Sequence, residues 1–266
     1  MSYDDPQSLF AGTSEHYLGY RIPHPGLFTD LVADLAPPGP VLDLGCGPGS
    51  VALALAERGR QVLAVDANAG MIAAGLAEAA RRACGPRINW MCADVHGLRD
   101  VPQVSAVTIA DAFHWFDRTE VLTMLEGLVA PGGFLAVIMS FSAGTAKPWW
   151  HPLTERIVDR YLGHARRAGP RARFVASDGG DHEAVLRASA FSDLTVMRTD
   201  QRVGMDLDHL LGNQHTQAFS SPPVLAGGRE DFDRDLRALL LAAEPTGQFE
   251  DTTQPGMIIA RRAQEA

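Results

Sequence analysis

A glycine-rich segment carries the residue types best suited to hold a small molecule. Residues 43–50 read DLGCGPGS and lie between a short apolar run and a helical pattern. Glycines let a backbone adopt positive φ and approach a ligand closely. A dinucleotide-binding loop places its third glycine one position later, and Pro48 removes an N–H that a pyrophosphate could use. The segment therefore favours a ligand that does not bind through phosphates.

Two acidic residues follow the next two predicted strands. Asp66 ends the second strand, about 20 residues past the loop, where a carboxylate reaches the hydroxyl pair of a ribose. Asp94 follows the third strand in the sequence CADV, and its carboxylate could accept a hydrogen bond from an adenine amino group. The loop itself sits at the carboxyl edge of the first strand, where open parallel sheets bind ligands.

Strand and helix patterns alternate from about residue 38. Repeated strand–helix units of this length predict an α/β fold, with a parallel sheet covered by helices on both faces. The expected strands are 41–44, 61–65, 87–92, 106–110 and 134–139, and the expected helices are 50–57, 71–82 and 120–128.

The alternation stops near residue 141. Residues 142–181 contain Trp149 and Trp150 but no strand pattern, which predicts an inserted helical cap. Two late strands joined by further cap helices would complete the sheet with an antiparallel edge. The expected strands are 194–203 and 248–261, and the expected helices are 183–190, 209–219 and 230–243.

Composition excludes several classes of protein. The 266 residues carry a net charge of −9, which argues against nucleic acid and anionic membranes as partners. The three cysteines form no CxxC pair, and no other metal-ligand spacing occurs, so we expect no metal. The N-terminus lacks an apolar run and no stretch approaches the roughly 20 apolar residues of a membrane span, so we expect a cytoplasmic protein.

Several segments of the sequence resemble those of the class I S-adenosylmethionine-dependent methyltransferases. The resemblance rests on DLGCGPGS at 43–50, AVDAN at 64–68 and CADV at 92–95. AFHWFD at 112–117 resembles the branch that includes trans-aconitate methyltransferases and many small-molecule methyltransferases of bacterial secondary metabolism. YLGYRIPHP at 17–25 is similar to that branch's Y-x-x-x-R-P-x-Y-P segment, but Ile22 and His24 replace a proline and a tyrosine. A role that depends on the tyrosine is therefore not carried over.

The resemblance implies a Rossmann-like sheet of seven strands and three functional parts. Residues 1–30 would form a helical flap over the cofactor. Residues 31–141 and 182–266 would form the cofactor-binding core, with cap helices at about 206–243. Residues 142–181 would form the substrate cap.

The resemblance also assigns residues to S-adenosylmethionine. The loop glycines would pass under its methionine and ribose, Asp66 would take both ribose hydroxyls, and Arg21 would bind the carboxylate. Asp43 would help hold the ammonium, although it could instead brace the loop, and Arg21 could instead form a surface ion pair. The complete set is Tyr17, Arg21, Asp43, Gly45, Cys46, Gly47, Gly49, Asp66, Ala67, Met71, Asp94, Val95 and Ala110.

Methyl transfer requires alignment of nucleophile, methyl and sulfur, and a base only when the nucleophile keeps its proton. His114, His24 and His215 are the candidate bases in that order, and for each the alternative is a structural imidazole. Trp115, Trp149 and Gln214 are candidates for contact with the substrate, with packing in the core or cap as the alternative.

We therefore expect a methyltransferase that acts on O or N of a small molecule, with C as a further option, in secondary metabolism. Its product would be S-adenosylhomocysteine, and the chain would be a monomer or a homodimer. One alternative is a protein of the same fold that uses the cofactor without methyl transfer. Nucleic-acid or protein methyltransferases and dinucleotide-dependent dehydrogenases are weaker alternatives.

Overall fold

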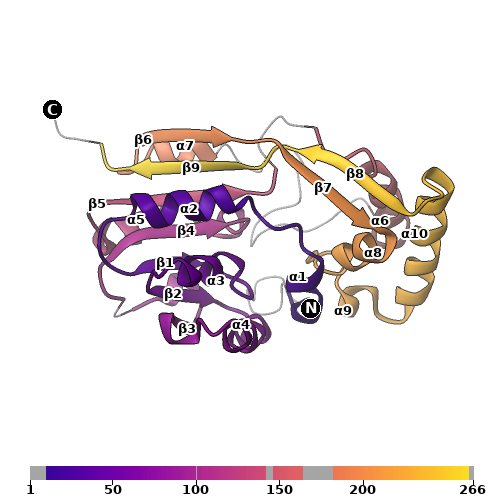
Figure 1. Ribbon diagram of the computed structural model, residues 1–266, viewed down its shortest axis with the longest axis horizontal. Helices are drawn as coiled ribbons and strands as arrows, with labels where there is room; N and C mark the ends of the chain where they lie inside the picture. Colours follow the sequence, from indigo (N-terminus) through magenta and orange to yellow (C-terminus); the bar gives the residue numbers. More distant parts are fainter. Residues whose placement is uncertain (1–9, 100, 142–145, 164–181, 264–266) are drawn as a thin grey trace.

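A seven-stranded sheet forms the core of the molecule (Figure 1). The computed structural model describes residues 10–99, 101–141, 146–163 and 182–263. The strand order is β3-β2-β1-β4-β5-β9-β6, and only β9 runs antiparallel to its neighbours. The chain order reverses between β1 and β4, so ligands of such sheets bind beyond the carboxyl ends of these two strands. The core strands are β1 Val41–Leu44, β2 Val62–Asp66, β3 Ile88–Cys92, β4 Val104–Ala110, β5 Val129–Met139, β6 Asp193–Arg198 and β9 Gly256–Arg261.

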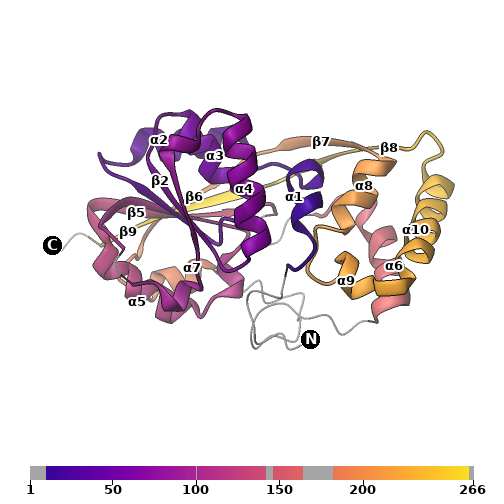
Figure 2. The ribbon, with the colours of Figure 1, turned by 90° about the horizontal axis from the view of Figure 1, so that it is seen from below.

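Helices cover both faces of this sheet, as the alternating pattern predicted (Figure 2). One face packs against α2, α3 and α4, and the other against α5 and α7. Every residue of β1 is buried, as expected for a parallel strand covered on two sides. Helix α2 was not predicted separately, and it covers the sheet with Phe28 and Val32. The bounds are α2 Gly26–Leu35, α3 Ser50–Glu57, α4 Ala69–Arg81, α5 Arg118–Leu128 and α7 His182–Arg187.

The two late strands are each divided, which corrects the prediction of single strands at 194–203 and 248–261. β6 and β9 stay in the core, whereas β7 Gln201–Asp206 and β8 Gln248–Thr253 pair only with each other. The second division lies at Pro255, which lacks the N–H that a continuous ladder needs. Its carbonyl accepts a hydrogen bond of 3.2 Å from the Thr199 N–H and closes the junction. The paired segments project from the core as a ribbon (Figure 1).

The ribbon leads to a second group of helices with its own apolar cluster. Phe232, Leu236 and Leu240 of α10 are fully buried there, together with Phe249 of β8. The described part of the predicted insert, helix α6, belongs to this cluster, and residues 142–145 and 164–181 lie outside the described residues. The remaining helices in this group are α6 His151–Leu162, α8 Leu207–Gln214, α9 Pro222–Leu225 and α10 Arg229–Ala243.

A short helix, α1 Ser14–Tyr20, lies between the core and this cap in both views (Figures 1 and 2). It contacts α4 of the core and α8 of the cap. The amide of Asn213 on α8 donates a hydrogen bond of 2.8 Å to the Tyr20 carbonyl. Gly212 permits this approach, because a Cβ there would lie 2.4 Å from the Tyr20 ring.

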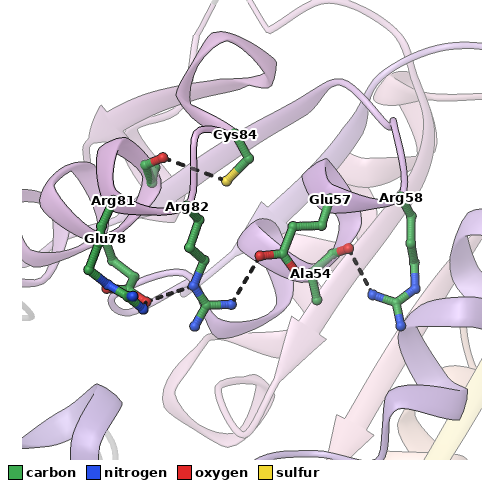
Figure 3. Close-up of polar contacts among 8 residues, drawn as sticks. Ala54, Glu57, Arg58, Glu78, Arg81, Arg82 and Cys84 are labelled. Carbon is green, nitrogen blue, oxygen red and sulfur yellow. Dashed lines mark hydrogen bonds and ion pairs between the residues drawn. The ribbon is translucent and has the colours of Figure 1, made fainter.

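The exposed sides of α3 and α4 are joined by charged side chains (Figure 3). Glu78 accepts hydrogen bonds from Arg81 and Arg82 at 2.6 Å, and Arg82 also reaches Glu57 on α3 at 3.3 Å. The two guanidinium groups lower the pKa of Glu78 to about 2. This network links the outer turns of two helices that flank the glycine-rich loop.

Within the described ranges, no helix combines the length and apolar character that a bilayer crossing requires. The same residues contain no group of three or more His, Cys, Asp or Glu side chains arranged to hold a metal ion.

The tight contact of Trp90 with α4 gives a test of the core. An added Cβ at Gly75 would lie 2.4 Å from the Trp90 ring and 3.0 Å from the Pro48 carbonyl oxygen. Gly75→Ala should therefore lower the free energy of unfolding by about 1–3 kcal/mol, despite the helix propensity of alanine. Gly127→Ala on α5 is the control, because a Cβ there meets nothing within 4 Å. It should raise stability by about 0.5–1 kcal/mol in the same urea titration. Equal effects of the two substitutions would contradict the packing described.

Candidate functional site

The loop from Gly45 to Gly49 connects β1 to α3 through three left-handed residues. Gly45, Gly47 and Gly49 have φ of +64°, +54° and +85°. A Cβ at Gly45 would lie 2.6 Å from the Ala112 Cβ, and one at Gly49 would lie 2.3 Å from the Trp90 ring. The loop therefore requires glycine both for its backbone conformation and for its contacts with the segments after β4 and in β3.

Asp43 lies under this loop and braces it. Its side chain is buried, with one oxygen accepting a 2.6 Å bond from the Thr108 hydroxyl and the other a 3.1 Å bond from the Ala52 N–H. Burial raises the pKa of Asp43 to about 7, and these two bonds oppose the shift. The structure thus shows the bracing contacts considered as the alternative role, and Cys46 beside it is buried in the loop.

Asp66 connects the ends of β1 and β2. Its carboxylate accepts 2.8 Å hydrogen bonds from the N–H groups of Gly47 and Asn68. Burial raises the pKa of Asp66, and both backbone bonds act in the opposite direction. Asn68 in turn caps α4 by accepting a 3.1 Å bond from the Met71 N–H. Asp66, which is predicted to bind the ribose hydroxyls, therefore lies directly beside the glycine loop.

The predicted adenine contacts follow at the ends of β2 and β3. Asp94 accepts a 2.9 Å bond from the His96 N–H and caps a short 3-10 helix, Val95–Gly97. Val95 and Met71 are buried, and the Ala67 carbonyl accepts a 3.6 Å contact from the Cys92 thiol. The structure thus brings these predicted residues to one edge of the sheet.

Helix α1 supplies Tyr17 and Arg21 at the opposite side of the loop. A Cβ added at Gly47 would lie 3.9 Å from the Tyr17 ring, and the Arg21 guanidinium lies 5.4 Å from the centre of that ring. Arg21 also donates a 3.4 Å bond to the hydroxyl of Thr216, which follows α8. Burial raises the pKa of the Tyr17 phenol, and the Arg21 cation opposes that shift.

Asp111, to which the sequence analysis assigned no role, joins the N-terminal segment to the sheet. It follows Ala110 at the end of β4 and adopts a φ of +48°. Its carboxylate accepts a 2.8 Å bond from the Ser140 N–H and a short bond from the Ser140 hydroxyl. Arg21 and His24 approach the same oxygen at 3.8 and 3.7 Å. Its pKa is lowered because His24, Arg21 and the Ser140 bonds together outweigh the opposing effect of burial. An acidic residue directly after the fourth strand was the available sequence signal.

The other two candidate histidines, His114 and His215, have different surroundings from His24. His114 is exposed on the 3-10 helix Phe113–Trp115. His215 is buried in the cap, where its Nε2 lies 2.8 Å from Asp233 and its Nδ1 lies 3.4 Å from the Ser220 carbonyl. Both nitrogens of His215 therefore have protein partners, which is the structural arrangement considered as its alternative.

The three candidate substrate residues do not come together in one contact. Trp115 packs edge-on against Phe10, with ring centres 5.4 Å apart. Trp149 stacks on Phe249, and its N–H groups donate to Asp251 and to the Glu250 carbonyl on the ribbon. Gln214 ends α8 and is partly buried. Of these, Trp149 shows the cap packing considered as its alternative.

Comparison with known proteins finds similarity to methyltransferases. Residues 41–133 match the family described as Methyltransferase domain. An uncharacterized methyltransferase of Mycobacterium tuberculosis (strain ATCC 25618 / H37Rv) is 36% identical over 114 residues, which cover 42% of this chain and 55% of that protein. A trans-aconitate 2-methyltransferase of Azoarcus sp. (strain BH72) is 35% identical over 102 residues, covering 37% and 38%. The chain thus spans about half, or less, of the length of these curated relatives.

Solved structures share the fold over nearly the whole chain. A putative type II methyltransferase from Anaeromyxobacter dehalogenans has a TM-score of 0.57 and 24% identity, over 92% of this chain and 98% of that one. A SAM-dependent methyltransferase from Geobacter sulfurreducens, in complex with S-adenosyl-L-homocysteine, has a TM-score of 0.56 and 16% identity over 96% and 98%. At these identities the likeness concerns the fold alone. The family match over residues 41–133 and this shared fold both agree with the predicted relation to methyltransferases.

The raised pKa of Asp43 predicts a stability that depends on pH. The folded protein holds a proton on Asp43 up to about pH 7, whereas the unfolded chain loses it near 3.8. Because the folded state binds the additional proton, this group makes stability fall as pH rises between these values. Asp43→Asn keeps a polar partner for Thr108 and Ala52 and removes the titration. From pH 5 to pH 7, the wild type should lose on the order of 2 kcal/mol relative to Asp43→Asn in urea unfolding. Parallel pH profiles for the two proteins would contradict the assignment.

Proposed function

Because residues 41–133 match a family described as Methyltransferase domain, we propose that this chain binds S-adenosylmethionine at the carboxyl edge of its sheet and transfers the methyl group to a small molecule. The observation that carries the proposal is the left-handed glycine loop joined to the Asp66 carboxylate where the strand order reverses. When bound, S-adenosylmethionine supplies a methyl group that its sulfonium has activated for in-line displacement.

The charges around the loop suit this ligand. S-adenosylmethionine carries an ammonium, a sulfonium and a carboxylate, together with a ribose and an adenine. Asp66 and Asp111 offer acceptors for hydroxyl groups and cations, and Arg21 offers a donor pair for a carboxylate. The Tyr17 ring lies within van der Waals distance of a Cβ placed at Gly47, so it can close over the glycine loop beside the ligand.

Each residue group would then have a distinct task. Asp66 would orient the ribose hydroxyls, whereas Asp94 and Val95 would hold the adenine edge. Arg21 and Tyr17 would close over the methionine part from α1, and the Ala110 carbonyl would face it from β4. Asp43 would act through the loop that it braces. These roles extend the resemblance residue by residue, supported by the proximity of the side chains in the structure.

The carboxyl ends of β4 and β5, which the proposed cofactor contacts leave free, would suit a small methyl acceptor. The β4 and β5 ends carry Asp111 and Ser140, and α1 separates this edge from the larger part of the cap. The Azoarcus relative is named for transfer to trans-aconitate, which is a small molecule. We propose transfer to oxygen or nitrogen, with carbon as a further option, in the biosynthesis of a secondary metabolite.

Cofactor titration provides the decisive experiment. Isothermal titration of the full chain should show micromolar binding of S-adenosylmethionine and S-adenosylhomocysteine and none of NAD. Asp66→Ala removes a ribose acceptor and the brace on Gly47, so it should weaken both affinities at least tenfold, which is about 1.4 kcal/mol.

Asp193→Ala is the matched control, because Asp193 is an exposed carboxylate at the start of β6, on the opposite edge of the sheet. Its affinities should equal those of the wild type. Absence of binding in the wild type, or an unchanged affinity in Asp66→Ala, would overturn the proposed site.

A further inference from the structure

A buried histidine nitrogen that has no hydrogen-bond partner among the described residues lies near the carboxyl end of β4. His24 is in the short connection between α1 and α2, and its side chain is only 12% exposed. Its Nδ1 is buried and has no hydrogen-bond partner among the described residues. A buried polar atom left without a partner costs about 1–3 kcal/mol. Such an atom at a binding edge indicates a ligand group that pairs with it.

Asp111 places a negative charge beside the Nε2 atom of His24. The His24 Nε2 lies 3.7 Å from the Asp111 carboxylate, and this oxygen can only accept a hydrogen bond. The carboxylate therefore favours the tautomer with hydrogen on Nε2, which leaves a lone pair on Nδ1. Such contacts are often long before the substrate binds and shorten in the complex.

The groups around His24 keep it neutral and able to accept a proton. Burial lowers its pKa, Arg21 from α1 adds to this effect, and Asp111 after β4 opposes it. Among the described residues, Tyr17 on α1 and His114 beyond β4 are the other titratable groups that interact with the same carboxylate. Of these groups, only Asp111 stabilises a charged His24, so it would also stabilise the imidazolium that forms after proton transfer.

His24 lies away from the ribose and adenine end of the proposed methyl donor. The predicted ribose and adenine contacts, Asp66 and Asp94, lie at the ends of β2 and β3. His24 instead contacts the carboxylate after β4, next to Ala112, which touches the loop at Gly45. It therefore lies beside the methionine end of the proposed cofactor, on the side left for the substrate.

Building on the proposed function, we propose that His24 is the general base of the reaction, that Asp111 is its positioning residue, and that the acceptor is a hydroxyl group of an alcohol or phenol. The hydroxyl O–H bond breaks as its proton moves to Nδ1. The oxygen electron pair forms the bond to the methyl carbon, and the carbon–sulfur electron pair remains on sulfur, which leaves S-adenosylhomocysteine. The proton then passes from His24 to water.

The tautomer can be tested without knowledge of the natural substrate. In ¹⁵N NMR spectra of the full chain with S-adenosylhomocysteine, His24 should be neutral at pH 7.5 with its hydrogen on Nε2. Asp111→Asn should reduce the share of this tautomer and lower the pKa of His24, because the carboxylate favours the charged ring. A hydrogen on Nδ1 in the wild type would overturn the proposal.

The chemical role is tested with labelled methyl groups and matched acceptors. The panel contains phenol, catechol and benzyl alcohol as hydroxyl acceptors, and benzoate and trans-aconitate as carboxylate acceptors. Transfer should occur to hydroxyl compounds and should fall at least 100-fold in His24→Asn, which retains a polar atom near Nδ1 but cannot accept the proton. Added imidazole should partly restore transfer in His24→Ala. His151→Asn, on α6 of the cap, is the control and should retain wild-type transfer.

Titration of each variant with S-adenosylhomocysteine separates this inference from the proposed function. His24→Asn should bind it within twofold of the wild type. Loss of binding in the wild type itself would overturn the proposed function. Intact binding with unchanged hydroxyl transfer in His24→Asn, or with transfer confined to carboxylates, would overturn only the role of His24. If Asp111 positions His24, the Asp111→Asn substitution should also move the acidic limb of the pH profile of the methyl-transfer rate to lower pH. A purely structural defect would not cause this shift.

Discussion

The site depends on one carboxylate buried beneath a loop that only glycines can form. Asp43 joins β1 to β4 through Thr108 and β1 to α3 through Ala52. Its raised pKa shows that burial opposes the charge, and the two hydrogen bonds offset part of that cost. Because β1 and β4 are the strands between which the chain order reverses, the same contacts hold both halves of the binding edge in register.

The other half of the site is assembled by α1. This short helix has no buried residue of its own and is positioned by contacts with α4 and α8. Its last turn brings Arg21 to Asp111 in the core and to Thr216 in the cap. Core and cap therefore meet through a polar helix at the proposed cofactor site, and the ribbon of β7 and β8 forms a second connection. A movement of the cap would change the position of Arg21 directly, because Arg21 is hydrogen-bonded to Thr216.

Much of the core could be predicted because its signals are local. The apolar runs of β1, β2 and β4 lie between glycines, prolines and acidic residues, and the helices begin close to the predicted positions. The division of the late strands was missed, since residues 194–203 and 248–261 each have the composition of one strand. Whether such a segment continues depends on the strand beside it, and the two divisions occur opposite each other at Thr199 and Pro255.

By itself, the sequence determined the loop and the acidic residues that follow β2 and β3, since glycine spacing and strand ends constrain backbone within a few residues. It did not determine which distant side chains meet. Asp111, Arg21 and His24 come together only because the connection between α1 and α2 reaches the end of β4. The three histidines were equivalent as residue types, and burial made them different. His215 is paired inside the cap, His114 is exposed, and His24 alone retains a buried nitrogen without a described partner. Tertiary structure decided this because hydrogen-bond partners and access to water are properties of packing between segments far apart in the chain.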